Sequence, residues 1–248
     1  MSIKSGPEKK DSITTVRGGI CLVLDPARPR TELLDRLGRA LDGGVKIVQV
    51  WNRWPEEFGR QEKEELIRKV LQIVYDRSRR TGRGRPGTVD VERENRNTEK
   101  GEKIPVLINE EWELLRTTAL DGVHFDGIPA DLSKIRNEIG REFLFGITCG
   151  NDLKTVVWAE ENGADYISFC AMFPSVSAGE CEIVKPETVR RAREITRLPL
   201  FVSGGITTEN LPGLRDLGID GVAVISGILN SDSPEEAAHT YQQILQTM

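Results

Sequence analysis

Short apolar runs and longer amphipathic stretches alternate along most of the chain. Residues 19–25 (GICLVLD), 45–51 (VKIVQVW) and 104–109 (IPVLIN) have the length and the branched apolar content of buried strands. Between them, residues 31–44 and 55–80 carry apolar side chains at helical spacing, and the first of these stretches closes with a Gly-Gly pair typical of a helix C-terminus. Each run and the stretch that follows it therefore predict one strand and one helix.

The same alternation continues to the C-terminal end of the chain. Further strands are predicted at residues 122–126, 143–148, 165–170, 198–205 and 221–226, and further helices at 111–120, 131–140, 152–162, 186–196, after 207–208, and at 233–246. Strands that alternate with helices imply a parallel sheet covered on both faces. Eight such modules match a single-domain α/β fold, the closed (β/α)₈ TIM barrel, with an open doubly wound sheet as the alternative.

Two segments do not follow this alternation. Residues 1–18 precede the first strand and are expected to form a flexible N-terminal segment, so that the barrel spans residues 19–248. Residues 81–103 are rich in glycine and charge and have almost nothing apolar to bury, which predicts a disordered insertion. Because it joins the second helix to the third strand, we expect it on the N-terminal face of the barrel, as a solvated loop or, alternatively, a partner-docking segment.

Composition excludes several classes of function. The 248-residue chain has a formal net charge of −5, so it has no basic field to hold a nucleic acid. The N-terminus lacks the apolar core of a signal peptide, and no segment approaches the roughly 20 apolar residues of a membrane span. We therefore expect a cytoplasmic protein with small-molecule partners and no nucleic-acid or membrane partner, while assembly as a homo-oligomer stays open.

The ends of the seventh and eighth predicted strands have a pattern typical of phosphate binding. Gly204 and Gly205 leave backbone N–H groups open to an anion, and Ser226-Gly227 begins a short helix whose N–H groups favour negative charge. In a barrel both loops lie on the C-terminal face, where barrel enzymes bind phosphate. The sequence thus predicts a phosphate cradle, with tight turns made by the glycines alone as the alternative.

Polar side chains after the other strands are candidates for the chemistry. They are Gln49, Trp51 and Arg53 after the second strand, Asn109, Glu110 and Glu111 after the third, His124, Asp126 and Asp131 after the fourth, Thr148 at the fifth, and Ser175 and Ser177 after the sixth. Carboxylates from adjacent loops offer the oxygen ligands that Mg²⁺ prefers, although acidic residues also stabilise the first turn of a helix. His124 is either a buried structural histidine or a residue that faces the substrate.

Seven segments of the chain resemble one known family. GGVKIVQVWNR, PVLINEEWELL, DGVHFDG, FGIT, ADYISFCAMFPSVS, VSGGITTENL and DGVAVISGI occur in this order and are similar to segments of thiamine phosphate synthase and its relatives, which include the thiazole tautomerases. The resemblance implies a (β/α)₈ barrel that couples hydroxymethylpyrimidine pyrophosphate to thiazole phosphate in thiamine biosynthesis. Such a transferase uses Mg²⁺ and releases pyrophosphate.

The resemblance also implies a role for each candidate residue. Reactant binding would fall to Gln49, Arg53, Asn109, Thr148, Ser175 and Ser177, phosphate binding to Gly204, Gly205, Ile225 and Ser226, and Mg²⁺ binding to Glu110, Asp126 and Asp131. Two alternatives stay open. One is a tautomerase or isomerase that acts on a phosphorylated heterocycle, and the other is a non-catalytic relative that binds a phosphorylated ligand.

The chain departs from the family pattern mainly at charged positions. Trp51 stands where the family has a cation, Glu110 where it has an aspartate, and Pro129 where it has a second metal-binding aspartate. Asp126 and Asp131 are the candidates to replace that aspartate. The predicted active site is therefore a divergent one.

Overall fold

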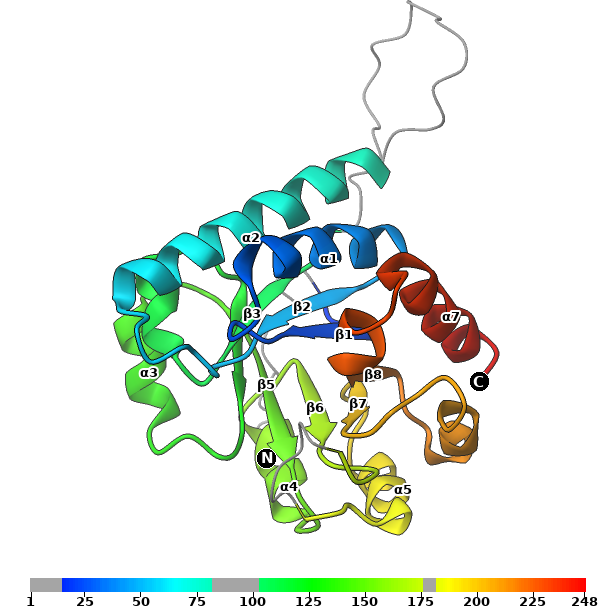
Figure 1. The fold of residues 1–248 in the computed structure, drawn as a ribbon. Helices are drawn as coiled ribbons and strands as arrows, with labels where there is room; N and C mark the ends of the chain where they lie inside the picture. Colours follow the sequence, from blue (N-terminus) through cyan, green and yellow to red (C-terminus); the bar gives the residue numbers. More distant parts are fainter. Residues whose placement is uncertain (1–14, 82–102, 176–181) are drawn as a thin grey trace, which may run out of the picture.

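The computed structural model describes residues 15–81, 103–175 and 182–248, which fold into a barrel (Figure 1). Its parallel strands are β1 (Gly19–Leu24), β2 (Ile47–Val50), β3 (Val106–Asn109), β4 (Gly122–Phe125), β5 (Leu144–Cys149), β6 (Tyr166–Phe169), β7 (Leu200–Ser203) and β8 (Gly221–Val224). Each strand pairs with the next, and β8 pairs with β1 to close the sheet. This closed barrel confirms the predicted fold class and rules out the open sheet.

Helical segments follow the strands and surround the barrel. The α-helices are α1 (Arg30–Asp42), α2 (Arg60–Thr81), α3 (Leu132–Ile139), α4 (Lys154–Glu161), α5 (Pro186–Ile195), α6 (Ser226–Leu229) and α7 (Pro234–Gln246), and η1 (Trp112–Arg116) and η3 (Leu211–Leu217) are 3₁₀ segments. Helix α1 lies between α2 and α7, which brings the first and last helices of the chain together (Figure 1). The N-terminal helix α1 and the C-terminal helix α7 thus pack against each other.

Two predicted α-helices are corrected by the structure. The stretch 111–120 forms only the 3₁₀ segment η1, after which the Thr118 hydroxyl donates to the carbonyl oxygen of Leu114 at 2.6 Å. Such bonds from a threonine side chain to its own backbone compete with regular helix bonding. The helix expected after the seventh strand is the 3₁₀ segment η3, which contains Gly213, a poor former of α-helix.

The barrel interior is filled by large side chains that glycines accommodate. One inner cluster consists of Val16, Cys21, Val23, Ile47, Leu107, Leu144, Tyr166 and Phe201. A Cβ atom at Gly146 would lie 2.1 Å from the Tyr166 ring, and one at Gly221 would lie 2.4 Å from the Phe201 ring. Tyr166 and Phe201 can therefore lie across the neighbouring strands only because those positions are glycine.

The structure describes only the ends of the N-terminal segment and of the insertion. Val16 is 4% exposed and packs in the inner cluster, so packed structure begins ahead of residue 19. The remainder of the N-terminal segment, residues 1–14, lies outside the described residues. The same is true of residues 82–102 of the insertion, which joins the end of α2 to the start of β3.

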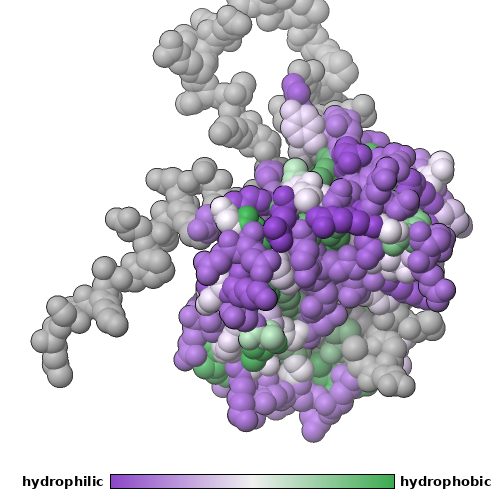
Figure 2. All heavy atoms as spheres, turned by 90° about the vertical axis from the view of Figure 1, so that its left-hand side faces the viewer, coloured by the Kyte–Doolittle hydropathy of each residue, from purple (hydrophilic) through white to green (hydrophobic). Residues whose placement is uncertain are grey.

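The outer face beside α3 is largely hydrophilic, with small separate apolar patches (Figure 2). Among the large apolar residues that are exposed, Ile128 precedes α3 and Val157 lies in α4. Within the three described ranges, no helix combines the length and the apolar character that crossing a membrane requires.

Candidate active site

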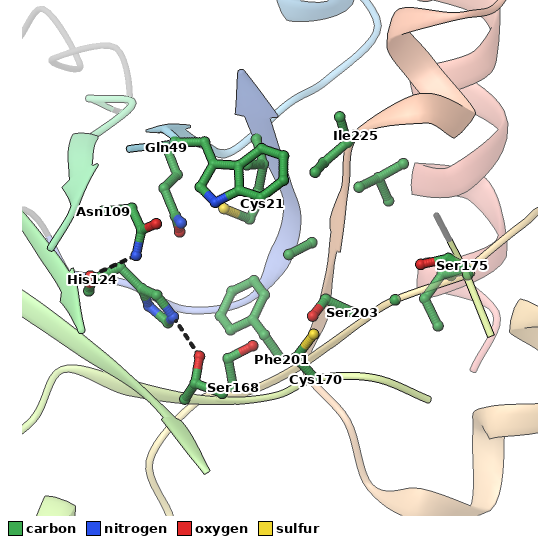
Figure 3. Close-up of a pocket in the computed structure, with 18 of the residues that line it drawn as sticks. Cys21, Gln49, Asn109, His124, Ser168, Cys170, Ser175, Phe201, Ser203 and Ile225 are labelled. Atoms are coloured by element: carbon green, nitrogen blue, oxygen red, sulfur yellow. Dashed lines mark hydrogen bonds between the residues drawn. The ribbon is translucent and has the colours of Figure 1, made fainter. Parts of the chain in front are cut away.

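A cavity of about 680 Å³ opens where the strands end at their C-terminal side. Every strand contributes to it, and its lining residues include Cys21, Val23, Gln49, Trp51, Arg53, Asn109, His124, Asp126, Thr148, Tyr166, Ser168, Cys170, Ser175, Phe201, Ser203, the segment 204–207 and the segment 223–227. Gln49, Asn109 and His124 lie on one side, and Ser175, Ser203 and Ile225 on the other (Figure 3).

Most of the predicted site residues meet in this one cavity. Those that line it are Gln49, Arg53, Asn109, Asp126, Thr148, Ser175, Gly204, Gly205, Ile225 and Ser226. Ser177 lies outside the described residues. Glu110 is one step removed, because its carboxylate accepts the backbone N–H of Asp126. Asp131 also lies apart, because its carboxylate caps α3 by accepting the backbone N–H of Lys134 at 2.8 Å.

The predicted phosphate cradle is built from backbone with left-handed torsion angles. Gly204 and Gly205 have φ values of 82° and 65°, a region that side chains disfavour. Close packing is a second reason for glycine, since a Cβ atom at Gly205 would lie 2.8 Å from Cβ of Phe173. Between described residues, no backbone hydrogen bond uses the N–H groups of Gly205, Ser226 or Gly227. These donors are free for an anion.

Helix α7 braces both loops of the cradle. The Tyr241 hydroxyl donates to the carbonyl oxygen of Ile206 at 2.9 Å, and this oxygen directly follows the two glycines. The same hydroxyl lies 2.3 Å from where a Cβ atom of Gly227 would be. The almost fully buried Tyr241 thus packs against the loops after both β7 and β8.

On the opposite side, β3 and β4 bring together an amide and two carboxyl groups. The Asn109 side-chain N–H group donates to Asp126 Oδ1 at 2.9 Å and to the carbonyl oxygen of His124 at 3.2 Å. Figure 3 shows the position of Asn109 above His124. The buried Oδ1 of Asn109 has no partner among the described residues. Glu110 has a φ of 62°, which is uncommon outside glycine and is found where function constrains the backbone.

Burial makes both carboxyl groups weaker acids than usual. Burial raises the pKa of Asp126, and the hydrogen bond from Asn109 opposes this rise. Burial also raises the pKa of Glu110, and the charge of nearby Asp126 adds to the rise, although the backbone N–H of Asp126 opposes it. Two carboxylates with no cation beside them in the described ranges are suited to bind one.

Arg53 is the only arginine or lysine among the described residues that line the cavity. Its Nη1 atom lies 3.4 Å from Asp25 Oδ2, and its guanidinium carbon lies 5.7 Å from the centre of the Trp51 ring. At the position where the resemblance implies a cation, Trp51 thus offers an aromatic surface to the guanidinium of Arg53. Its exposed side chain leaves the guanidinium accessible to an anionic ligand.

His124, whose role the sequence left open, lines the cavity. Its Nδ1 lies 2.8 Å from the Tyr166 hydroxyl and its Nε2 lies 2.9 Å from the Thr148 hydroxyl. Burial lowers the pKa of His124 to about 4, so its ring is neutral at physiological pH. Both ring nitrogens are engaged by hydroxyl groups, which leaves neither free to act as a general base.

Sequence reasoning missed Tyr166, Ser168 and Ser203 as residues of the cavity. Tyr166 and Ser168 are two positions apart on β6 and therefore point to the same side of the strand. The alternation of side chains along β6, together with Gly146 on the neighbouring strand, is the sequence feature that indicates Tyr166 and Ser168 as residues of the cavity.

The family model described as thiamine monophosphate synthase matches residues 88–228, which is more than half of the chain. The chain belongs to this family. A curated thiamine-phosphate synthase of Geobacillus kaustophilus is 30% identical over 82% of this chain and 81% of its own length. One of Nitrosococcus oceani is 26% identical over 93% of both chains.

A solved structure with the same fold is the thiamine phosphate pyrophosphorylase from Pyrococcus furiosus. It superposes with a TM-score of 0.69 at 18% identity and covers 92% of this chain and 96% of its own. The resemblance seen in the sequence is therefore confirmed, both in the family and in the fold.

Proposed function

We propose that the protein is a thiamine phosphate synthase, a transferase that couples hydroxymethylpyrimidine pyrophosphate to thiazole phosphate. The observation that carries this proposal is the composition of a single cavity. It combines a backbone cradle for a phosphate after β7 and β8 with polar side chains at the ends of β2 to β5. Its volume of about 680 Å³ lies within the usual range for small-molecule sites.

The two substrates would bind on opposite sides of the cavity. The phosphate of the thiazole would bind at Gly204, Gly205, Ile225 and Ser226. The N–H groups of Gly205, Ser226 and Gly227, which make no backbone hydrogen bond to a described residue, lie in these loops. Hydroxymethylpyrimidine pyrophosphate would bind near Gln49, Arg53 and Asn109. Hydroxyl groups of Thr148, Ser175 and Ser177 complete the proposed set of hydrogen-bonding partners.

The reaction requires orientation and charge stabilisation rather than a general base. The bond between the pyrimidine methylene carbon and the pyrophosphate oxygen breaks, and pyrophosphate leaves with the electron pair. The thiazole nitrogen then donates its lone pair to the methylene carbon and forms the new C–N bond. No proton is transferred in these two steps, which agrees with a site in which both nitrogens of His124 are engaged.

The residues present fit the Mg²⁺ ion that the family implies. Asp126 in the cavity, the unpartnered Oδ1 of Asn109 and the nearby Glu110 offer a set of oxygen atoms that suits a hard cation. In the described parts of the chain, no three His, Cys, Asp or Glu side chains lie close enough together to hold a metal ion. Water and substrate oxygens would therefore complete the coordination. When bound, the ion would neutralise charge on the departing pyrophosphate. Asp131 was also predicted as a ligand, but its carboxylate caps α3 and would have to leave the helix terminus.

The other expectations from the sequence form part of this proposal and are open to test. They are a cytoplasmic location and small-molecule partners, while assembly as a homo-oligomer stays open. A tautomerase or a non-catalytic binding relative would share the cradle, so the assay has to separate these functions from a synthase.

A turnover assay tests the proposal directly. The purified protein is mixed with hydroxymethylpyrimidine pyrophosphate, thiazole phosphate and Mg²⁺, and both products are measured by liquid chromatography and mass spectrometry. We expect thiamine phosphate and pyrophosphate in equal amounts, and neither product when one substrate is omitted. If thiazole phosphate binds by calorimetry but no product forms, the protein is a phosphate-binding relative and the proposal fails.

A further inference from the structure

A row of three hydrogen-bonded side chains runs from the barrel interior to the cavity. Tyr166 on β6 contacts Nδ1 of His124 on β4, with 2.8 Å between the oxygen and the nitrogen. Nε2 of the same ring lies 2.9 Å from the Thr148 hydroxyl at the end of β5 (Figure 3). Tyr166 and His124 are 2% and 5% exposed, whereas Thr148 is partly exposed. The row therefore ends in a hydroxyl that a ligand can reach.

The surrounding residues hold both rings in place. The His124 and Tyr166 rings stack with their centres 5.5 Å apart, and the edge of Tyr166 packs on Phe201 with 5.4 Å between the centres. Gly146 leaves the space that the Tyr166 ring fills. The backbone of His124 is fixed as well, because its carbonyl oxygen accepts bonds from the backbone of Glu110 and the side chain of Asn109.

The hydrogen positions follow from the partners of the Tyr166 hydroxyl. Among the described residues, His124 Nδ1 is the only hydrogen-bond partner that this hydroxyl has. If Nδ1 carried a hydrogen, the buried Tyr166 O–H group would have no acceptor, and an unpaired buried donor costs free energy. Nδ1 is therefore the acceptor. Because Nδ1 accepts, the neutral ring carries its one hydrogen on Nε2.

We propose that His124 donates from Nε2 to the Thr148 oxygen, so that the Thr148 hydroxyl directs its own hydrogen into the cavity toward an acceptor atom of the ligand. Thr148 would then contact the substrate, while His124 and Tyr166 act as positioning residues. An oxygen of the leaving pyrophosphate is an acceptor of the required kind. The contact between Thr148 and the leaving pyrophosphate rests on the proposed function. The position of the hydrogen on His124 does not, because it is a property of the protein without ligand.

Nitrogen NMR of the wild-type protein tests the hydrogen position without reference to activity. The chain contains two histidines, and the second, His239, is exposed on α7 and serves as an internal control. In protein labelled with ¹⁵N at histidine, couplings to the ring protons show which nitrogen carries hydrogen. We expect hydrogen on Nε2 of His124 and none on Nδ1. Hydrogen on Nδ1 alone would overturn the proposal, whatever the activity of the enzyme.

Substitution of Tyr166 tests whether it sets this arrangement. Tyr166→Phe removes the O–H donor while keeping the ring, so the Nδ1-protonated form of His124 should gain population. The exposed Tyr75→Phe is the matched control and should leave the His124 signals unchanged. An unchanged His124 tautomer in a folded Tyr166→Phe variant would contradict the role of Tyr166. Should this variant not fold, the wild-type spectrum still decides the hydrogen position.

Kinetics of Thr148 variants test the consequence for the reaction. We expect Thr148→Val to lower kcat about tenfold with little change in KM, since a hydrogen bond formed mainly in the transition state acts on kcat. Thr148→Ser keeps the hydroxyl and should restore most of kcat. Equal kcat for Thr148→Val and wild type would refute the donor role. If wild type itself forms no thiamine phosphate, the proposed function fails while the NMR result on His124 stands by itself.

Discussion

One side of the cavity presents backbone groups, and the other presents side chains. After β7 and β8, free backbone N–H groups next to left-handed glycines form the cradle. At the ends of β2 to β4, the side chains of Arg53, Asn109 and Asp126 form the site. The backbone side requires only that glycine be present at the right loop, whereas the other side depends on the identity of each charged residue.

The difference shows where a family site can change. The resemblance implies glycines in this loop, and the structure gives Gly204 and Gly205 both positive φ values and close neighbours. On the other side, the resemblance implies a cation at the position of Trp51 and an aspartate at that of Pro129, and here Asp126 places a carboxylate in the cavity. Side-chain functions can move to a neighbouring position, but a backbone cradle cannot move without rebuilding the loop.

The largest expected effect comes from Asp126 on the side-chain side. Asp126→Asn keeps the size of the side chain and removes its negative charge. If Asp126 binds the metal, turnover should fall about a hundredfold, which corresponds to a little under 3 kcal/mol of barrier. The rate of product formation and the Mg²⁺ concentration that gives half-maximal rate are the quantities to measure.

Asp131→Asn is the matched control for this prediction. Asparagine caps helices about as well as aspartate, so α3 should stay intact. Because the Asp131 carboxylate is used in the cap, we expect turnover near the wild-type value. A large loss in Asp131→Asn with none in Asp126→Asn would reverse the assignment of the two carboxylates.

The second effect concerns the cradle. Gly205→Ala places a Cβ atom where Phe173 and Pro174 already lie, on a backbone with positive φ. We expect binding of thiazole phosphate to weaken about tenfold and the free energy of unfolding to fall by about 1–3 kcal/mol. Calorimetry and chemical denaturation measure these quantities.

Gly213→Ala is the control for the cradle prediction. A Cβ atom there meets nothing within 4 Å, and its φ is not positive. It should leave affinity and stability close to wild type. Equal affinities of the Gly205→Ala and Gly213→Ala variants would remove the cradle from the binding site.

An effect on affinity of similar size is expected at Arg53, the one arginine or lysine among the described lining residues. Arg53→Gln should weaken binding of hydroxymethylpyrimidine pyrophosphate about tenfold, because a charge-assisted bond to a phosphate oxygen is lost. The affinity for thiazole phosphate should hardly change if the two substrates occupy opposite sides. Similar losses for both ligands would contradict that division of the cavity.

The smallest effect is expected at Ser226. If the cradle binds through backbone N–H groups, Ser226→Ala should change the affinity for thiazole phosphate by no more than about twofold. A loss as large as that of Gly205→Ala would show that the hydroxyl, not the backbone, binds the phosphate.

Local patterns in the sequence were sufficient to predict the barrel and the glycine loops after β7 and β8, whereas the phosphate-binding role of these loops stays a prediction. Alternating apolar runs determine the strands, and the glycines after β7 and β8 report directly on the backbone. The helices expected at 111–120 and after 207–208 are present only as the short 3₁₀ segments η1 and η3, a difference that the apolar spacing did not reveal.

Contacts between strands could not be predicted in the same way. Tyr166 reaches His124 across β5, and this contact exists only because Gly146 leaves room for the ring. The bond from the backbone of Asp126 to Glu110 likewise depends on the unusual φ of Glu110. These arrangements depend on residues distant in sequence, so a pattern read along one strand does not contain them.

The most direct test of the central claim is a crystal structure of the protein with thiamine phosphate, pyrophosphate and Mg²⁺ bound. The account predicts the ester phosphate at hydrogen-bonding distance from the backbone N–H groups of Gly205 and Ser226. Pyrophosphate and the ion should lie on the opposite side, beside Arg53 and Asp126. An ester phosphate bound beside Arg53, or ligands bound outside this cavity, would contradict the account.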